Sequence, residues 1–232
     1  MITVKKLIKA YKGINAVEID HLELYPGEVI GLVGNNGAGK TTFFRLLLDL
    51  IRANSGEVLS KGKTVTATEE WKAYTAAYID EGFLIDYLTP EEYFYFVGKL
   101  NQLSKADVDD FLQHYLSFFD DAILSKGKYI RDYSKGNQFK IGIVAALLAN
   151  PEFLILDEPF ANLDPTTQLR LIDMIKNMAA NKRMCIVVSS HDINHVSAVC
   201  SRILLMEKGK IVKDIAGGEA AYEEMVEYFK VK

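Results

Sequence analysis

The sequence predicts an α/β fold in which helices cover both faces of a mainly parallel sheet, with an antiparallel β part at the N-terminus and an inserted helical subdomain. Residues 2–25 alternate apolar and polar side chains, which is typical of antiparallel strands. From residue 151 onward, short apolar strands alternate with helical stretches, which favours a parallel sheet. We expect one domain over residues 1–232, with residues 1–81 and 150–232 forming the core and residues 82–149 forming the helical insertion.

Composition and charge limit the class of protein. Of the 232 residues, 49% are hydrophobic, which is enough for a sizeable core. The net charge is −4 and no long block of Lys or Arg occurs, so we expect no nucleic-acid partner. The longest apolar run, residues 141–149, is about half of the roughly 20 residues that a membrane-spanning helix needs. Residues 1–6 lack the layout of a signal peptide, so a cytosolic location is expected.

The antiparallel part contains one candidate ligand contact, Tyr11. We expect the strands within residues 2–25 to flank the next strand, residues 29–33, and Tyr11 lies between them. An aromatic ring at this place can stack on a nucleotide base, and such stacking is worth about 1–3 kcal/mol. An ordinary strand-end tyrosine is an equally good interpretation.

A glycine-rich loop joins the buried strand 29–33 to a helix predicted over residues 42–48. The loop matches all four fixed positions of the Gly-x4-Gly-Lys-Thr pattern, in which glycines let backbone N–H groups converge on a phosphate. Lys40 adds a cation for the β- and γ-phosphates, the Thr41 hydroxyl can bind Mg²⁺, and Thr42 is placed for the α-phosphate. The predicted nucleotide contacts are Gly34, Asn35, Asn36, Gly37, Ala38, Gly39, Lys40, Thr41 and Thr42.

The middle of the chain predicts a hairpin at residues 55–58 and 64–66, a strand at 76–79, and then the helical insertion. Residues 89–92 read Thr-Pro-Glu-Glu, the pattern of a capping box with proline in the first turn. The insertion carries aromatic residues that are too evenly spread to face one core, so we expect some of them to line a partner surface. A small aromatic core is the alternative for Phe83, Tyr87, Tyr93, Phe94, Tyr95 and Phe96.

Strand and helix alternate again in the C-terminal third. Strands are predicted at residues 153–156 and 184–188, with a helix at 166–180 between them. Cys185 and Cys200 lack metal-type spacing and are interpreted as reduced structural residues. The remaining elements are expected at residues 196–200, 202–206, 211–212 and 222–229.

Two acids, Asp157 and Glu158, end the apolar strand 153–156. Burying carboxylates is costly unless a cation or a proton-transfer role offsets it. We expect Asp157 to reach Mg²⁺ through its water shell and Glu158 to polarise an attacking water, a contribution of about 10²–10⁴ in rate. The alternative is a pair of acids that caps the next helix. Ligands bind at the carboxyl ends of parallel strands, so the glycine-rich loop, the two acids and His191 are expected to share one site.

Residues 133–138 read Tyr-Ser-Lys-Gly-Asn-Gln and lie shortly before the acidic strand. Together with the phosphate loop, the two acids, residues 162–164 (Asn-Leu-Asp) and His191, they resemble, in order and over nearly the entire chain, the nucleotide-binding subunits of ATP-binding cassette (ABC) transporters. The resemblance implies a P-loop NTPase core, ATP and Mg²⁺ as cofactors, and ATP hydrolysis with Lys40, Glu158 and His191 as catalytic residues.

The resemblance also implies partners. Such subunits form a homodimer or a pair of related subunits around two ATP molecules, in which Ser134 and the Gly136 N–H meet the γ-phosphate bound by the other chain. They drive a separate integral membrane permease, expected here to dock near Phe83 and Tyr93, so that the chain is peripheral on the cytoplasmic face of the membrane. Glu81 stands where the family commonly offers glutamine to Mg²⁺, and Lys135 and Asn137 also depart from its commonest signature.

Three other functions compete with transport. A soluble ATPase of the same superfamily, acting on a non-membrane partner such as the ribosome or DNA, usually carries two cassettes or a long coiled coil, and this chain has neither. A nucleotide sensor without turnover is disfavoured because Lys40, Asp157, Glu158 and His191 are all present. A small-molecule kinase leaves the signature segment unexplained.

Overall fold

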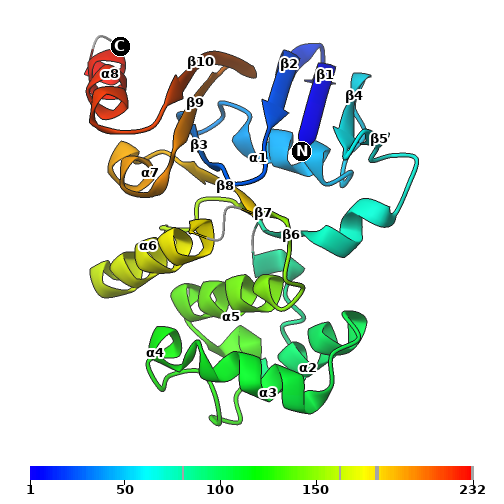
Figure 1. Ribbon diagram of the computed structural model, residues 1–232, viewed down its shortest axis with the longest axis vertical. Helices are drawn as coiled ribbons and strands as arrows, with labels where there is room; N and C mark the ends of the chain where they lie inside the picture. Colours follow the sequence, from blue (N-terminus) through cyan, green and yellow to red (C-terminus); the bar gives the residue numbers. More distant parts are fainter. Residues whose placement is uncertain (80, 162, 181–182, 231–232) are drawn as a thin grey trace.

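The computed structural model describes residues 1–79, 81–161, 163–180 and 183–230 (Figure 1). The strands are β1 (Ile2–Tyr11), β2 (Ile14–Leu24), β3 (Val29–Val33), β4 (Ser55–Ser60), β5 (Lys63–Thr64), β6 (Thr75–Tyr78), β7 (Phe153–Leu156), β8 (Cys185–Ser190), β9 (Arg202–Glu207) and β10 (Lys210–Ala216). The α-helices are α1 (Lys40–Leu47), α2 (Pro90–Leu100), α3 (Lys105–Gln113), α4 (Leu116–Phe119), α5 (Lys135–Leu147), α6 (Pro165–Ala179), α7 (Ile193–Val199) and α8 (Glu219–Lys230), with short 3-10 helices at Glu70–Tyr74, Glu81–Phe83 and Ile130–Asp132.

The central sheet has the strand order β10-β9-β3-β8-β7-β6. Strands β9, β3, β8, β7 and β6 pair in parallel, and β10 adds an antiparallel edge. Every residue of β3, β7 and β8 is buried, as expected for parallel strands that are covered on both faces. The predicted α/β fold with a mainly parallel sheet is confirmed.

The antiparallel part forms a second sheet with the order β2-β1-β4-β5. This result corrects one expectation, because β1 and β2 do not flank β3. The neighbours of β3 are β8 and β9, which come from the far end of the chain. Parallel strands must be joined by a long crossover connection. The parallel partners of β3 therefore come from distant parts of the chain and not from the strands next to it in sequence.

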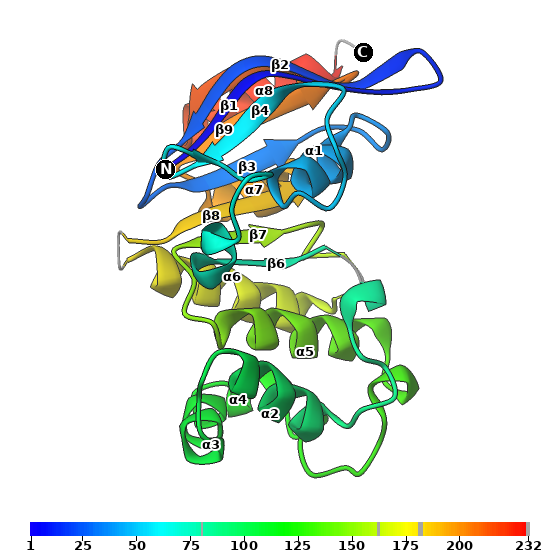
Figure 2. The ribbon, with the colours of Figure 1, turned by 90° about the vertical axis from the view of Figure 1, so that its right-hand side faces the viewer.

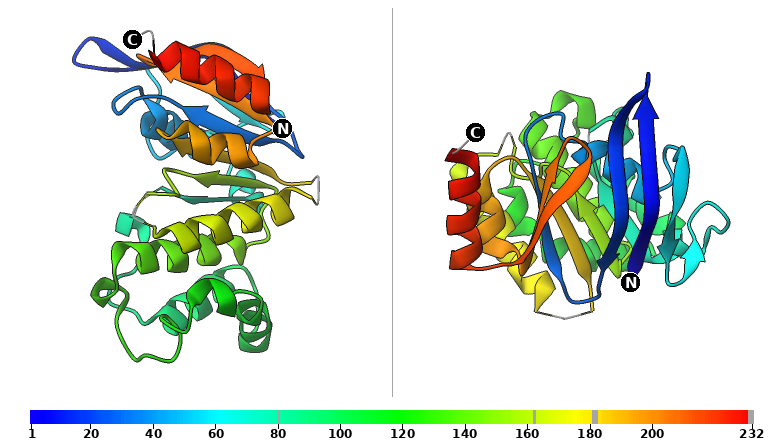
Figure 3. Two further views of the ribbon diagram at one scale, coloured as in Figure 1. Left: turned by 90° about the vertical axis from the view of Figure 1, so that its left-hand side faces the viewer. Right: turned by 90° about the horizontal axis from the view of Figure 1, so that it is seen from above.

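The two faces of the central sheet bury different helices. Alternate residues of β3 divide between two hydrophobic cores: Ile30 and Leu32 share one core with α1 and the antiparallel sheet, and Val29 and Val33 share the other with α5, α6 and α7. Figure 2 shows α1 and the antiparallel sheet on one side of β3, and Figure 3 shows α6 and α7 on the other. Helix α1 and helix α5 therefore cover opposite faces.

Helices α2 to α5 form a helical region between β6 and β7 in the chain, and Figure 1 shows it below the central sheet. Helix α5 packs directly on β6, because a Cβ at Gly142 would lie 2.0 Å from the Tyr78 ring. Helix α2 begins with the predicted capping box, in which Thr89 accepts from the Glu92 N–H and Glu92 accepts from the Thr89 N–H. The exact limits of the helical subdomain, residues 82–149, stay a prediction.

The aromatic residues of this region divide between core and surface. Phe94 is fully buried against Phe119, with a ring distance of 5.8 Å, and Tyr93 and Tyr95 pack partly against the same core. Phe83, Tyr87 and Phe96 are 52%, 63% and 44% exposed. The aromatic core and the exposed aromatic surface are thus both present.

The C-terminal elements begin or end a few residues away from the predicted limits. Helix α7 starts at Ile193 rather than residue 196, because the Asp192 side chain accepts from the Asn194 N–H and caps the helix. Cys185 and Cys200 are both free and buried. Within the described ranges, no helix combines the length and apolar character that crossing a bilayer requires.

Candidate nucleotide site

The glycine-rich loop runs from the carboxyl end of β3 to the first residue of α1, Lys40. Gly39 has a φ of 109°, and a Cβ at this position would lie 2.3 Å from the Ala16 carbonyl oxygen, so only glycine fits the turn. The Lys40 side chain is buried and its ammonium donates to the Gly34 carbonyl at 2.7 Å. The lysine side chain thus folds back onto the first residue of the loop whose backbone N–H groups can converge on an anion.

Asp157 follows β7 and meets the loop through Thr41. The Thr41 hydroxyl donates to Asp157 Oδ2 at 2.5 Å, and the Ser189 hydroxyl donates to Asp157 Oδ1. Burial raises the pKa of the Asp157 carboxyl, and the neighbouring Glu158 charge acts in the same direction. The two hydroxyl donors and the Lys40 charge oppose that rise, because they stabilise the ionised carboxylate.

Glu158 connects three parts of the site. Its backbone has a φ of 47°, in the left-handed region that residues other than glycine seldom adopt. Its Oε1 lies 3.1 Å from Lys40 Nζ, and its Oε2 lies 2.9 Å from His191 Nδ1. The phosphate loop, the end of β7 and the end of β8 are thus linked by one carboxylate, as the strand-end argument predicted.

The signature segment lies elsewhere in the chain. Ser134 is the exposed N-cap of α5 and its hydroxyl accepts from the Asn137 N–H at 3.3 Å, with Gly136 in the first turn. Helix α5 covers the face of the central sheet opposite to α1. The structure therefore does not bring Ser134 and Gly136 together with the set formed by Lys40, Asp157, Glu158 and His191.

The family follows from the comparison with known proteins. The chain matches the family model described as ABC transporter over residues 17–161, which is more than half of its length. It is 33% identical over 213 residues to the uncharacterized ABC transporter ATP-binding protein MJ1023 of Methanocaldococcus jannaschii, with 91% of this chain and 76% of that protein covered. The chain belongs to the ABC transporter ATP-binding proteins. The cassette is also 30% identical over 221 residues to the uncharacterized ABC transporter ATP-binding protein YhcH of Bacillus subtilis, covering 91% of the cassette and 68% of that protein.

Solved structures resemble this cassette over most of its length. The ATP-binding subunit of an ABC transporter superposes with a TM-score of 0.82 at 27% identity, covering 93% of the cassette and 90% of that chain. A dimeric post-hydrolysis state of the ATP-binding cassette MJ0796 bound to ADP and Pi gives a TM-score of 0.80 at 22% identity, covering 93% and 98% of the two chains. The second likeness shows the shared fold.

The residues present fit a magnesium ion. Mg²⁺ prefers hard oxygen ligands, and in nucleotide sites it takes one or two protein oxygens and completes its shell with phosphate and water. The Thr41 hydroxyl and the Asp157 carboxylate offer such oxygens side by side. Among the described residues, no group of three or more His, Cys, Asp or Glu side chains is arranged to hold a metal ion.

The nucleotide or metal contacts predicted for Tyr11 and Glu81 stay predictions, as do the roles predicted for the other site residues. Tyr11 ends β1 and is 49% exposed, with Lys9 Nζ 5.1 Å from its ring centre. The next strand passes the phosphate loop at Ala16, so the ring lies on a hairpin that reaches the site. The Glu81 side chain and Asn162 fall outside the part of the cassette that the structure describes.

Sequence reasoning missed Ser189. This residue is fully buried in β8, donates to Asp157 and accepts from the Glu158 N–H at 2.8 Å. One signal was available: residues 189–191 read Ser-Ser-His, and polar side chains at the end of an otherwise apolar strand mark an edge where ligands bind.

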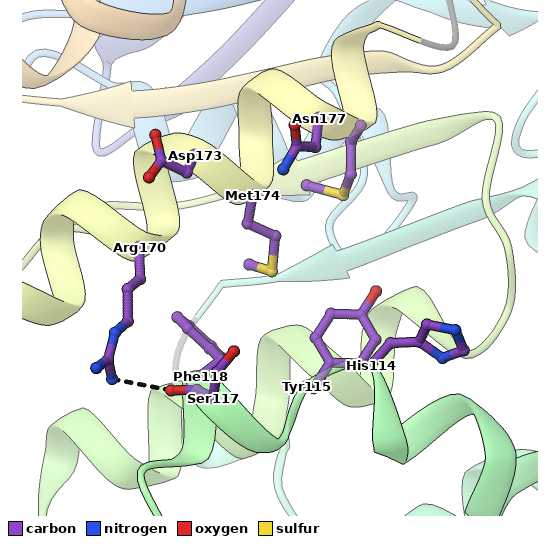
Figure 4. A pocket seen from close by; sticks show the side chains of 9 residues that line it. His114, Tyr115, Ser117, Phe118, Arg170, Asp173, Met174 and Asn177 are labelled. Carbon is purple, nitrogen blue, oxygen red and sulfur yellow. Dashed lines mark hydrogen bonds between the residues drawn. The ribbon is translucent and has the colours of Figure 1, made fainter.

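A separate groove of about 610 Å³ lies between α6 and the stretch formed by α4 and the residues just before it (Figure 4). Arg170 donates to the Ser117 carbonyl at its edge, and the side chains of Met174, Tyr115 and Phe118 face the gap. None of the predicted site residues lines this groove, so it is distinct from the nucleotide site.

Proposed function

We propose that the cassette binds ATP with Mg²⁺ and hydrolyses it to ADP and phosphate, as the energy-supplying subunit of an ABC transporter. The observation that carries this proposal is the connected set of Lys40, Thr41, Asp157, Glu158 and His191 at three adjacent strand ends. The set contains a phosphate cradle, oxygen ligands for a divalent cation and a carboxylate that can accept a proton.

In the structure, the Lys40 ammonium is shared between the Gly34 carbonyl and the Glu158 carboxylate. A triphosphate that enters the loop competes with Glu158 for this ammonium, because charge-assisted hydrogen bonds to phosphate are strong. Loss of that contact leaves Glu158 Oε1 available to a water molecule. We therefore expect nucleotide binding itself to expose the general base.

Hydrolysis then requires a water oxygen to attack the γ-phosphorus while ADP leaves and the water proton passes to Glu158. His191 holds Oε2 of the same carboxylate through Nδ1, which keeps the other oxygen directed toward the loop. Thr41 and Asp157 would hold Mg²⁺, which when bound neutralises charge on the phosphates.

A dimer completes this proposal. The signature residues Ser134 and Gly136 begin a helix on the opposite face of the sheet from α1, so a second chain is the simplest source of a signature for each phosphate loop. The N-terminus of α5 carries the partial positive charge of the helix dipole, which suits a γ-phosphate. The dimeric form of the similar cassette MJ0796 supports this arrangement.

The permease is proposed to dock near Phe83 and Tyr93. A groove of about 270 Å³ opens beside Phe83, and its walls include Leu50 and Trp71. Leu50 and Phe83 both line this groove and are 47% and 52% exposed, an apolar surface suited to a helix of a membrane protein. Tyr87, four residues after Phe83 in the chain, is 63% exposed. Docking there would place the cassette at the cytoplasmic face of the membrane.

Replacement of Glu158 tests the chemistry. Glu158→Gln keeps the shape of the side chain but accepts no proton, so turnover should fall by about 10²-fold or more while ATP binds at least as tightly as to the wild type. The matched control is Glu152→Gln, because Glu152 lies just before β7 and forms an exposed ion pair with Lys61. Steady-state ATPase activity and nucleotide titration decide the result. Turnover of Glu158→Gln equal to that of the control would exclude Glu158 as the base.

A further inference from the structure

Ser189 contributes a polar side chain to the site from the interior of the central sheet. It lies in β8, the strand between β3 and β7 (Figure 1). It is opposite Leu32 in register and fully buried. A buried hydroxyl is costly unless its hydrogen bonds are made. Apolar residues occupy the preceding positions of this strand, so a serine here needs a reason beyond packing.

The Ser189 hydroxyl makes both hydrogen bonds to the catalytic segment. It donates to Asp157 Oδ1 and accepts from the Glu158 N–H at 2.8 Å. The other carboxylate oxygen, Oδ2, accepts from Thr41 at 2.5 Å. The Asp157 carboxylate is therefore held from both sides, by β8 and by α1, and its orientation is fixed.

The second bond acts on the backbone of Glu158. This residue adopts a φ of 47°, and such a conformation persists only where its surroundings hold it. Ser189 accepts a hydrogen bond from the Glu158 N–H. Because φ is the rotation about the N–Cα bond, holding this N–H restrains the φ of Glu158. The turn then delivers the carboxylate to Lys40 and His191.

We propose that Ser189 is a positioning residue, which orients Asp157 for the divalent cation and fixes the turn that carries Glu158. In this proposal Ser189 acts only through its bonds to Asp157 and to the Glu158 N–H. The inference rests on the proposed ATPase function and adds to it a residue that acts through two others. Hydrogen-bond partners of metal ligands typically contribute about 10–100-fold in metal affinity or activity.

Ser189→Ala is the test, with Ser60→Ala as the matched control. Ser60 is also a buried serine of a β-strand, but its hydroxyl pairs with the Tyr74 hydroxyl in the antiparallel sheet, away from the site. ATPase activity is measured against Mg²⁺ at fixed ATP and against ATP at saturating Mg²⁺. For Ser189→Ala we expect kcat to fall about 10-fold and the half-saturating Mg²⁺ concentration to rise several-fold, with the KM for ATP within about twofold of wild type.

A second readout does not depend on turnover. In the Glu158→Gln background with ATP bound, Mn²⁺ titration should show several-fold weaker metal binding when Ser189→Ala is added, and no change when Ser60→Ala is added. If Ser189→Ala does not fold, Ser189→Cys, which keeps a similar volume but offers a weaker donor and acceptor, is measured instead.

The inference would be overturned if the Ser189 variant had the same kinetics and Mn²⁺ affinity as Ser60→Ala. That result is expected if Ser189 has a purely structural role. If the wild type hydrolyses ATP and the Ser189 variant does so equally well, this inference is refuted but the proposed function is not. A wild-type cassette that hydrolyses no ATP refutes the proposed function instead.

Discussion

The contact between Lys40 and Glu158 predicts a measurable coupling in the nucleotide-free protein. The two charged atoms lie 3.1 Å apart, with the Lys40 side chain 7% exposed and the Glu158 side chain 28% exposed. At this distance an effective dielectric constant of about 20 gives roughly 5 kcal/mol of direct attraction. Desolvation and side-chain entropy offset most of it, so about 1–2 kcal/mol of coupling should remain.

A double-mutant cycle with Lys40→Met, Glu158→Gln and the double variant measures this coupling by urea unfolding, without nucleotide or Mg²⁺. Methionine keeps the apolar stem of Lys40, so that packing changes least. The cycle should be repeated with a saturating non-hydrolysable ATP analogue bound to wild type and Glu158→Gln. There, loss of the Glu158 charge should cost less stability than in the nucleotide-free state, because phosphate takes over Lys40.

Two results would refute this reasoning. Coupling below about 0.3 kcal/mol in the nucleotide-free state is within the usual error of additivity and would show that the ion pair does not stabilise the protein. An unchanged effect of Glu158→Gln with the analogue bound would show that phosphate does not replace the carboxylate at Lys40.

Three further predictions follow from burial and exposure. Phe94→Ala should lower the free energy of unfolding by about 3–5 kcal/mol, measured in urea, because the ring is fully buried against Phe119; a loss below 1 kcal/mol would contradict that packing. Tyr87→Asp should leave the ATPase activity of the isolated cassette unchanged and abolish copurification with the permease, so a retained complex would place the docking surface elsewhere. Burial raises the pKa of the Cys185 thiol to about 12 and also raises that of Cys200, so neither should react with a thiol reagent at pH 8 until denaturant is added.

Local sequence signals were sufficient wherever the decisive interactions are close in the chain. The phosphate loop and its strand–helix setting are read from one short segment, because glycine positions and apolar periodicity act on neighbouring residues. The strand at residues 153–156 appears with the predicted limits, and the capping box at residues 89–92 forms as expected. The strand-end rule also placed His191 with the two acids.

The sequence was less informative where the outcome depends on which strands become neighbours. The expectation that β1 and β2 flank β3 was wrong, since β3 takes its partners from residues 185–207. Ser189 was overlooked for the same reason. Its bonds to Asp157 and to the Glu158 N–H exist only because β8 pairs with β7 in one register, and nothing local to Ser189 encodes that register.

The sequence by itself therefore determined the chemistry that is available: a phosphate cradle, a threonine and an aspartate for a divalent cation, a glutamate for a proton and a histidine beside it. Only the tertiary structure decided how these groups connect. It placed Glu158 between Lys40 and His191, tied Asp157 to Ser189 and Thr41, and put α1 and α5 on opposite faces of the sheet. The physical reason is that periodicity and turn geometry act within a few residues, whereas strand order and register are fixed by burial summed over the whole core.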